Sequence, residues 1–266
     1  MDYTRSRSLY VLLCAFLLCT SCTGNQAAHP GYIEGEYTYI ASGVSGTLFS
    51  LTVQRGQTIT QGTLLYALDP NPEKDNALAY QAHLADLQAQ TTFSKAQYER
   101  QKILIAKNAT PKATLEEAQT DFLSKSQQHA ETAAQLAQAN WSLQQKMQYA
   151  PLNGQVFDTF YRVGEKVEAN HPVLALLAPE NIKVLFYIPE AELHKIKLGQ
   201  SITFSCDHCK GKTRATISYI SPEAEFTPPV IYSKDTRYKL VYLVRASMPL
   251  EISKQFHPGQ PIDVYL

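Results

Sequence analysis

The stretch SGVSGTLFSLTVQRGQTITQGTLLYALDP, residues 42–70, decides the fold, because its pattern returns as APLNGQVFDTFYRVGEKVEANHPVLALLAP at residues 150–179. Aligning Gly46 with Gly154 keeps the two stretches in register without a gap. The register then pairs Leu48 with Val156, Gly56 with Gly164, Ile59 with Val167 and Leu68 with Leu176. An internal repeat has to be recognised before a fold is assigned. Two copies, not a longer array, predict one small β-domain that an insertion splits into two halves.

The insertion has the composition of long helices. Residues 73–106 and 112–149 are rich in Ala, Gln, Leu and charge and contain neither Gly nor Pro. The sequence KNATP, residues 107–111, separates them, and Pro111 is a suitable first residue for the second helix. Each helix would measure about 50–57 Å at 1.5 Å per residue. A turn this short forces the two helices to pack antiparallel, so we expect a helical hairpin over residues 71–149.

Apolar spacing along both segments favours a coiled coil with a thin seam. The residues near a and d positions are Leu84, Leu87, Thr91, Ser94, Tyr98 and Ile105 in the first helix, and Leu115, Ala118, Phe122, His129, Ala133, Leu136, Leu143 and Met147 in the second. His129 is interpreted as a seam residue and not as a ligand. A seam this narrow holds two helices together but buries little else, so the hairpin should stand in solvent or lie against partner subunits.

The remainder of the chain reads as β-structure. Residues 31–42 alternate apolar and polar side chains, which is typical of a strand, and residues 23–41 are expected to form a tether and a first strand that joins a barrel. Residues 180–266 contain several short strand patterns and predict that small antiparallel barrel, with a connecting loop at residues 224–235. The predicted fold class is α+β: a split β-sandwich (halves 42–70 and 150–179), which the family resemblance described below makes lipoyl-like, an inserted coiled-coil hairpin, and a β-barrel.

The N-terminus resembles an export signal. Arg5 and Arg7 precede an apolar run at residues 9–19, and Thr20-Ser21-Cys22 supplies small residues before a cleavage point. A cysteine at the cut resembles a lipoprotein signal, which would make residues 1–22 a signal peptide ending at a lipidated Cys22. Plain secretion and an uncleaved anchor are the alternatives. All three place the rest of the chain outside the cytoplasm.

Composition excludes several functions. The chain has 24 basic and 24 acidic residues, and this neutrality argues against a nucleic-acid partner. No stretch after residue 22 is apolar for long enough to span a bilayer. The sequence contains no nucleophile elbow, zinc-protease, phosphate-loop or dinucleotide motif, and its seven His are not spaced as metal ligands. We therefore predict no enzyme, no cofactor and no metal site.

The motif CDHC, residues 206–209, is the one candidate for thiol chemistry. Cys206 and Cys209 would be the only cysteines left after signal cleavage and lipidation, and nearby cysteines in an oxidising compartment commonly pair. A disulfide is the first interpretation, and it would stiffen the loop between two predicted hairpin strands. Free thiols, and metal or redox chemistry with His208, remain open alternatives.

The order of these segments resembles the periplasmic adaptor proteins, or membrane fusion proteins, of the HlyD type. GTLFSLTVQRGQTITQGTLLYALD and GQVFDTFYRVGEKV are similar to the two halves of that family's lipoyl-like domain. PEAEFTPPVIYS at residues 222–233, with RYKLVYLVRA and HPGQPIDVYL, is similar to the subgroup that works with ABC-type exporters. The resemblance implies a periplasmic protein that forms a ring, a hexamer, and links an inner-membrane exporter to an outer-membrane channel. No Lys stands at the junctions where a lipoyl carrier would be modified.

The hairpin turn is where the resemblance implies contact with the channel. Adaptors of this type carry Arg, then Leu four residues on, then Ser seven residues beyond; Arg100 and Leu104 match, but Pro111 replaces the Ser. With Lys107 and Asn108, these two residues form the expected contact surface; the plain alternative for Arg100 is an ordinary exposed helix residue. A stand-alone envelope lipoprotein that binds a ligand or scaffolds a complex is the alternative function.

Overall fold

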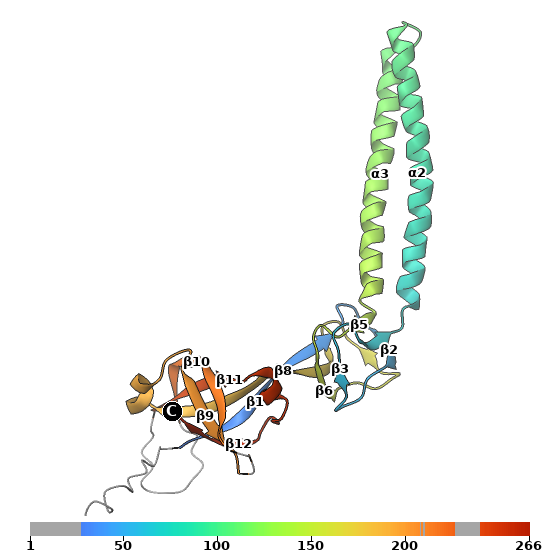
Figure 1. Cartoon of the computed structure of the whole chain (residues 1–266). Coiled ribbons are helices and arrows are strands. Elements are labelled where there is room, and N and C mark those ends of the chain that lie inside the picture. The colour runs from blue at the N-terminus through green and yellow to red at the C-terminus, as the bar shows by residue number, and fades with distance from the viewer. Residues whose placement is uncertain (1–27, 208, 210, 227–239) are drawn as a thin grey trace, which may run out of the picture. The chain divides into compact units, whose positions relative to one another are not determined.

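The structure is a computed structural model that describes residues 28–207, 209, 211–226 and 240–266 (Figure 1). It divides into two compact units, one formed by residues up to Gly35 with Ile182–Leu266 and the other by Glu36–Asn181. The second unit contains both copies of the repeat and the inserted helices. Strands β1 (His29–Ala41) and β8 (Pro172–Pro189) contribute residues to both units.

The repeat folds into a β-sandwich. Its strands are β2 (Gly46–Leu51), β3 (Thr58–Ile59), β4 (Leu64–Leu68), β5 (Met147–Tyr149), β6 (Gly154–Thr159) and β7 (Lys166–Val167), with the adjoining parts of β1 and β8. One sheet has the order β5-β4-β2-β7, and in the other β6 lies between β3 and β8. The pairs β2–β4, β2–β7, β3–β6, β4–β5 and β6–β8 are all antiparallel.

The two copies of the repeat occupy equivalent places in the sandwich, and strands of one copy pair with strands of the other. Strand β2 of the first copy pairs with β7 of the second, opposing Gly46 to Val167. Strand β6 of the second copy pairs with β3 of the first, opposing Gly154 to Ile59. Because each half borrows a strand from the other, neither half could bury its apolar face alone.

The turns repeat this exchange. Gly56 and Gly164 both adopt positive φ, 84° and 94°, which an L side chain would resist. The N–H of Gly56 donates to the carbonyl of Val156, and the N–H of Gly164 donates to that of Leu48, both at 2.8 Å. The alignment made from the sequence therefore corresponds to equivalent hydrogen bonds in the fold.

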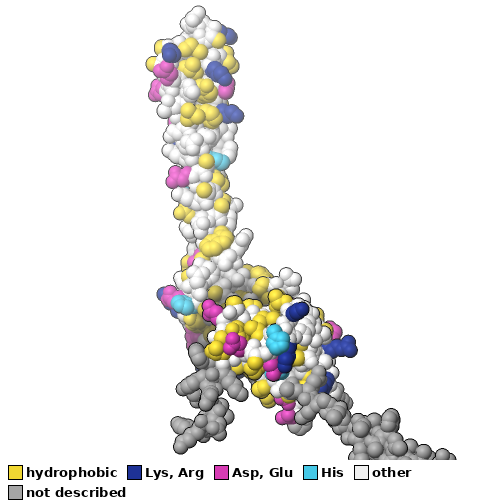
Figure 2. Space-filling view, turned by 90° about the vertical axis from the view of Figure 1, so that its left-hand side faces the viewer, with side chains coloured by type: hydrophobic (Ala, Val, Ile, Leu, Met, Phe, Trp, Pro, Cys, Tyr) yellow, Lys and Arg dark blue, Asp and Glu magenta, His cyan; other side chains and the backbone are white. Residues whose placement is uncertain are grey.

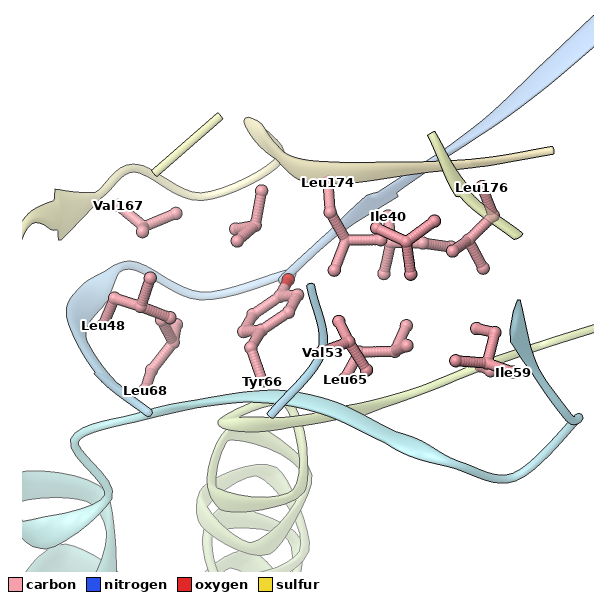
Figure 3. Close-up of a cluster of buried hydrophobic side chains, with 13 residues drawn as sticks. Ile40, Leu48, Val53, Ile59, Leu65, Tyr66, Leu68, Val167, Leu174 and Leu176 are labelled. Carbon is pink, nitrogen blue, oxygen red and sulfur yellow. The ribbon is translucent and has the colours of Figure 1, made fainter. Parts of the chain in front are cut away.

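One apolar core fills the sandwich (Figure 3). Its members are Ile40, Leu48, Val53, Ile59, Leu65, Tyr66, Leu68, Ala150, Val156, Val167, Val173, Leu174 and Leu176. Tyr66 reaches from β4 toward the opposite sheet, and its buried hydroxyl has no hydrogen-bond partner among the described residues. Burial raises the pKa of this phenol well above its ordinary value.

The insertion is a pair of long helices, α2 (Asn71–Ala106, 36 residues) and α3 (Lys112–Gln144, 33 residues). All predicted seam residues that lie in the helices are buried or half-buried, whereas Met147 is exposed and lies in β5. The expectation that the second helix continues to Tyr149 is wrong. The chain leaves the helix after Gln144 because Met147–Tyr149 must pair with β4. Thr132 and Ala139, the most buried residues of α3, were not placed in the seam by the sequence.

The other unit is a small antiparallel barrel. Its strands follow the order β1, β12 (Pro261–Tyr265), β9 (Ser201–Ser205), β10 (Thr213–Phe226), β11 (Leu240–Ser247) and β8, and β1 also pairs with β8 to close the sheet. The short helices η1 (Glu190–Lys195) and α4 (Leu250–Ser253) connect strands. The predicted α+β fold class of split sandwich, inserted hairpin and barrel is confirmed. Of the expected loop at 224–235, Ala224–Phe226 instead continue β10, because they pair with β11; residues 227–235 lie outside the described residues.

Candidate functional site

The free end of the hairpin has a defined backbone. Helix α2 closes with the N–H of Asn108 donating to the carbonyl of Ile105 at 3.0 Å and that of Ala109 donating to Leu104 at 2.9 Å. Asn108 has φ 50°, so it supplies the left-handed residue that this paired C-terminal motif requires. The tip is therefore a rigid cap and not a loose loop.

The predicted contact residues lie on this cap. Arg100, Lys107 and Asn108 are exposed, and Leu104 is half-buried. Among the described residues neither Arg100 nor Lys107 forms an ion pair, whereas the neighbouring Lys102 contacts Glu99 at 3.7 Å. The Arg100 guanidinium thus keeps its donors for a partner, and its planar fork can bind a carboxylate or backbone carbonyls.

Pro111 occupies the position where the family resemblance led us to expect Ser. Pro111 is the exposed residue that precedes α3, and its carbonyl accepts the N–H of Thr114 at 3.2 Å. The nearest hydroxyl, on Thr110, is half-buried and donates to the side-chain oxygen of Gln101 at 3.1 Å. Thr110 therefore does not replace the missing Ser, and the tip offers Arg100 and Leu104 without a third matching residue.

Charge is concentrated in the half of the hairpin that contains the tip (Figure 2). Residues 95–125 carry Lys95, Glu99, Arg100, Lys102, Lys107, Lys112, Glu116, Glu117, Asp121 and Lys125. In the other half, residues 71–94 and 126–144, such side chains are Glu73, Lys74 and Asp75 at the start of α2, with Asp86 and Glu131. Charge recognition by the hairpin is thus possible mainly near its free end.

Exposed apolar side chains occur in both halves of the hairpin, including Leu78 and Trp141 nearer the sandwich, and were not identified from the sequence. Phe93, Ile103 and Leu123 expose 67%, 59% and 51% of their surface. They lie outside the seam, so the heptad pattern that found the seam could not assign them. An outward apolar residue on a helix that is otherwise polar is the signal that could have found them.

The root of the hairpin, where it meets the sandwich, contains a buried ion pair. Lys146, whose side chain is 3% exposed, contacts Glu73 in the first turn of α2, with Nζ and Oε2 2.9 Å apart. The same Nζ donates to the carbonyl of Ser45 at 2.9 Å. Sequence analysis missed this site because Lys146 stands among polar residues and its partners lie 73 and 101 positions away.

Further hydrogen bonds join the end of α3 to the loop between β1 and β2. The Ser42 hydroxyl donates to the carbonyl of Gln145 at 2.9 Å, and the Gly43 N–H donates to the Gln145 side-chain oxygen at 3.4 Å. Ser42 is fully buried, and its carbonyl accepts the N–H of Asn170 at 2.8 Å. Ser42 therefore links α3, the β1–β2 loop and the turn before β8.

The two barrel cysteines lie together in the β9–β10 loop. The structure joins Cys206 and Cys209 as a disulfide with their Cα atoms 5.1 Å apart, and both residues are half-buried. His208 and Cys22 lie outside the described residues. Among the residues that the structure describes, no group of three or more His, Cys, Asp or Glu is placed to hold a metal ion.

Neither long helix is a membrane span. Within the described part of the chain, no helix combines the length and the apolar content that crossing a bilayer requires.

A split sandwich that carries a helical hairpin and joins a small barrel is the architecture of membrane fusion proteins. Solved structures share it: the membrane fusion protein Spr0693 from Streptococcus pneumoniae R6 superposes with a TM-score of 0.67 at 16% identity, covering 90% of this chain and 97% of that one. MacA from Actinobacillus actinomycetemcomitans gives a TM-score of 0.63 at 21% identity, covering 90% of this chain and 78% of that one. A MacA–MexA chimera containing the Pseudomonas aeruginosa MexA α-hairpin domain gives 0.62 at 22% identity, covering 90% and 79%.

The chain belongs to the family described as RND MFP, barrel-sandwich hybrid domain, which matches residues 36–178, more than half of its length. A UPF0194 membrane protein from the asrC 5′ region of Acidithiobacillus ferridurans is 27% identical over 89% of this chain and 85% of its own length. The protein YdhJ of Escherichia coli K12 is 31% identical over 64% of this chain and 59% of its own length. The resemblance to membrane fusion proteins inferred from the sequence is thereby confirmed.

Proposed function

We propose that this protein is the periplasmic adaptor of a tripartite export system and links an inner-membrane exporter to an outer-membrane channel. The free end of the hairpin would contact the channel, and the barrel unit would contact the exporter. Copies of the chain would assemble into a ring, a hexamer, and a lipid on Cys22 would hold each copy to a membrane. The adaptor would work as a link between proteins and not as an enzyme.

The hairpin tip is the observation that carries this proposal. Its backbone is fixed by the cap at Asn108, and Arg100 is exposed without an ion pair among the described residues. Charged side chains gather in the same half of the hairpin, where the apolar residues Ile103 and Leu123 are also exposed. A rigid, charged and partly apolar end is suited to docking, whereas a stand-alone lipoprotein has no need of one.

The exporter is proposed to be of the ABC type. This rests on the resemblance of residues 222–233, and of the strands around them, to the ABC-associated subgroup. The matching family is named after RND systems, so purification of the lipidated protein with an RND exporter, and without an ABC permease, would replace this part of the proposal.

Charge reversal at the tip tests channel docking. Arg100→Asp and Leu104→Asp should abolish crosslinking to the outer-membrane channel and abolish export, while helicity and exporter binding persist. Lys95→Asp and Leu78→Asp are matched controls on the same helix, since both residues are exposed and lie nearer the sandwich along α2. Normal crosslinking and export by both tip variants would show that the tip is not the docking surface.

Mass spectrometry of the native N-terminus tests anchoring. We expect diacylglycerol on Cys22, and Cys22→Ser should leave a soluble or unprocessed protein. Cleavage at another residue with no acyl mass would contradict the lipid anchor and leave the docking proposal untouched.

A further inference from the structure

We propose that Lys146 is a positioning residue that fixes the direction of the hairpin on the sandwich. The inference deepens the proposed adaptor function, since an adaptor must present its tip at a defined place. It rests on the contacts of one buried amino group, and those contacts do not depend on which channel or exporter the protein serves.

Lys146 connects three segments that otherwise meet the sandwich separately. It lies just beyond α3, its Nζ contacts Glu73 at the start of α2, and the same atom donates to Ser45 in the β1–β2 loop. Its own carbonyl accepts the N–H of Leu68 at the end of β4, at 2.7 Å. The two chain connections between hairpin and sandwich would alone allow the hairpin to rotate. The contacts of Lys146 restrict this rotation because they run in different directions.

The sandwich provides space for this side chain at one glycine. A Cβ on Gly46 would lie 2.8 Å from the Lys146 Nζ and 3.2 Å from the Leu68 Cβ. The equivalent residue of the second copy, Gly154, is close-packed for another reason, because a Cβ there would approach the Leu177 carbonyl oxygen at 2.7 Å. The two glycines that define the repeat therefore have different structural roles, and only Gly46 accommodates the root ion pair.

Stability alone does not explain a buried ion pair at this place. Replacing such a pair by apolar residues is often neutral or stabilising, whereas its directional contacts select one arrangement over others. Glu73 Oε2 and the carbonyl oxygen of Ser45 each lie 2.9 Å from the Lys146 Nζ, and they require this atom at one place, which an apolar contact would not. Lys146 is thus better suited to set an angle than to add stability.

The length of the hairpin makes this angle important. Helix α2 has 36 residues. At 1.5 Å per residue it spans about 54 Å, so a tilt of about 10° at the root moves the tip by about 9 Å. A displacement of this size exceeds the reach of a side chain such as Arg100, so loss of the root ion pair would misplace a chemically intact tip.

Distance measurements within the sandwich–hairpin unit test the proposal. Spin-labelled unnatural amino acids are placed at Thr58 on the sandwich and Gln127 on α3, both exposed, in the otherwise intact protein. The native protein should give one narrow distance distribution. Lys146→Met, and the milder Glu73→Gln, should broaden the distribution with helicity retained, and export should fall in proportion to the broadening. Lys112→Met removes the exposed ion pair with Glu116 and serves as the matched control, for which no broadening is expected.

A double variant separates positioning from stabilisation. Lys146→Met with Glu73→Leu leaves no unpaired charge, so its melting temperature should return toward that of the native protein. The proposal requires its distance distribution to stay broad. A narrow distribution in either Lys146 variant would overturn the proposal and reduce Lys146 to a packing role. Broad distributions with undiminished export would uphold the positioning role and count against the adaptor function.

Discussion

The sandwich and the hairpin are held by different means, although they belong to one compact unit. The sandwich buries thirteen apolar residues in one cluster. The buried residues of both helices together are Ala77, Leu87, Ser94, Thr132 and Ala139, most of them small or polar. The difference indicates that the sandwich specifies its own structure, whereas the hairpin depends on a thin seam and on its root.

The seam is thin because its side chains are small. Burying apolar surface stabilises a fold by about 25 cal/mol per Å². Ala and Ser bring little such surface, but they let the two helices approach closely. Aromatic stacking strengthens the seam near the tip, where the Tyr98 and Phe122 rings lie parallel with centroids 6.0 Å apart.

Truncation in the sandwich core should have the largest effect. Leu176 is fully buried and belongs to the cluster (Figure 3). Leu176→Ala should lower the free energy of unfolding by about 3–5 kcal/mol, the range for well-packed cores. Urea titration followed by circular dichroism measures this. A loss below about 1 kcal/mol would mean that the core tolerates a cavity and would weaken the contrast with the hairpin.

A leucine-to-alanine change in the helical seam should lower the free energy of unfolding by less. Leu87, 4% exposed, is the largest buried side chain of the hairpin. We expect Leu87→Ala to cost about 1–3 kcal/mol, because neighbours on a two-helix seam can relax into the space. Hydrogen exchange should show this loss in the helices and not in the sandwich. Equal losses in both regions would show that the unit unfolds as one body.

The barrel disulfide is expected to contribute less than either. Its loop is short, since Cys206 and Cys209 are separated by three positions. Cys206→Ala should therefore lower the free energy of unfolding by about 1–2 kcal/mol and leave export largely intact. Thermal melting and thiol titration of envelope protein are the measurements. Complete loss of export at an unchanged melting temperature would point to redox or metal chemistry.

Tyr66→Phe should have the smallest effect, and the opposite sign. Removing a buried hydroxyl that lacks a partner should stabilise the sandwich by about 1 kcal/mol. Because burial raises the pKa of the Tyr66 phenol, its hydroxyl keeps the proton in the folded state at pH values at which the unfolded state has lost it. The native protein is thus fully stable below the unfolded pKa of about 10 and loses stability as pH rises above it. Denaturant titrations should show that the free energy of unfolding falls less between pH 8 and pH 11 in Tyr66→Phe than in the native protein. An equal fall in the two proteins would contradict the assignment of this pH dependence to Tyr66.

The sequence predicted most of what depends on local patterns. The repeat identified the sandwich because apolar residues at equivalent positions, such as Leu48 and Val156, point into one core. Heptad spacing identified Leu87 and Ser94 in the seam. The end of α3 was missed because residues 145–149 contain no Gly or Pro, and strand pairing with β4 overrides their helical composition.

The root could not be predicted because it depends on distant residues. Lys146 pairs with Glu73 only where the chain folds so that Gly46 leaves room for the amino group. Nothing within a few residues of Lys146 indicates burial. The tip residues were predicted from the family resemblance instead. The cap at Asn108 follows from the sequence KNATP, because Asn readily adopts the left-handed conformation that ends a helix.

The hairpin enters and leaves the sandwich through neighbouring strands, since β4 pairs with β5. For evolution, this makes the insertion a replaceable part. Adding one heptad to each helix would lengthen the hairpin by about 10 Å and keep the seam in phase, with no residue of the sandwich changed. A single continuous segment of DNA encodes the insertion, so duplicating or exchanging that segment would change the hairpin and leave the sandwich as it is. The MacA–MexA chimera, which carries the hairpin of another protein, shows that such an exchange yields a folded molecule.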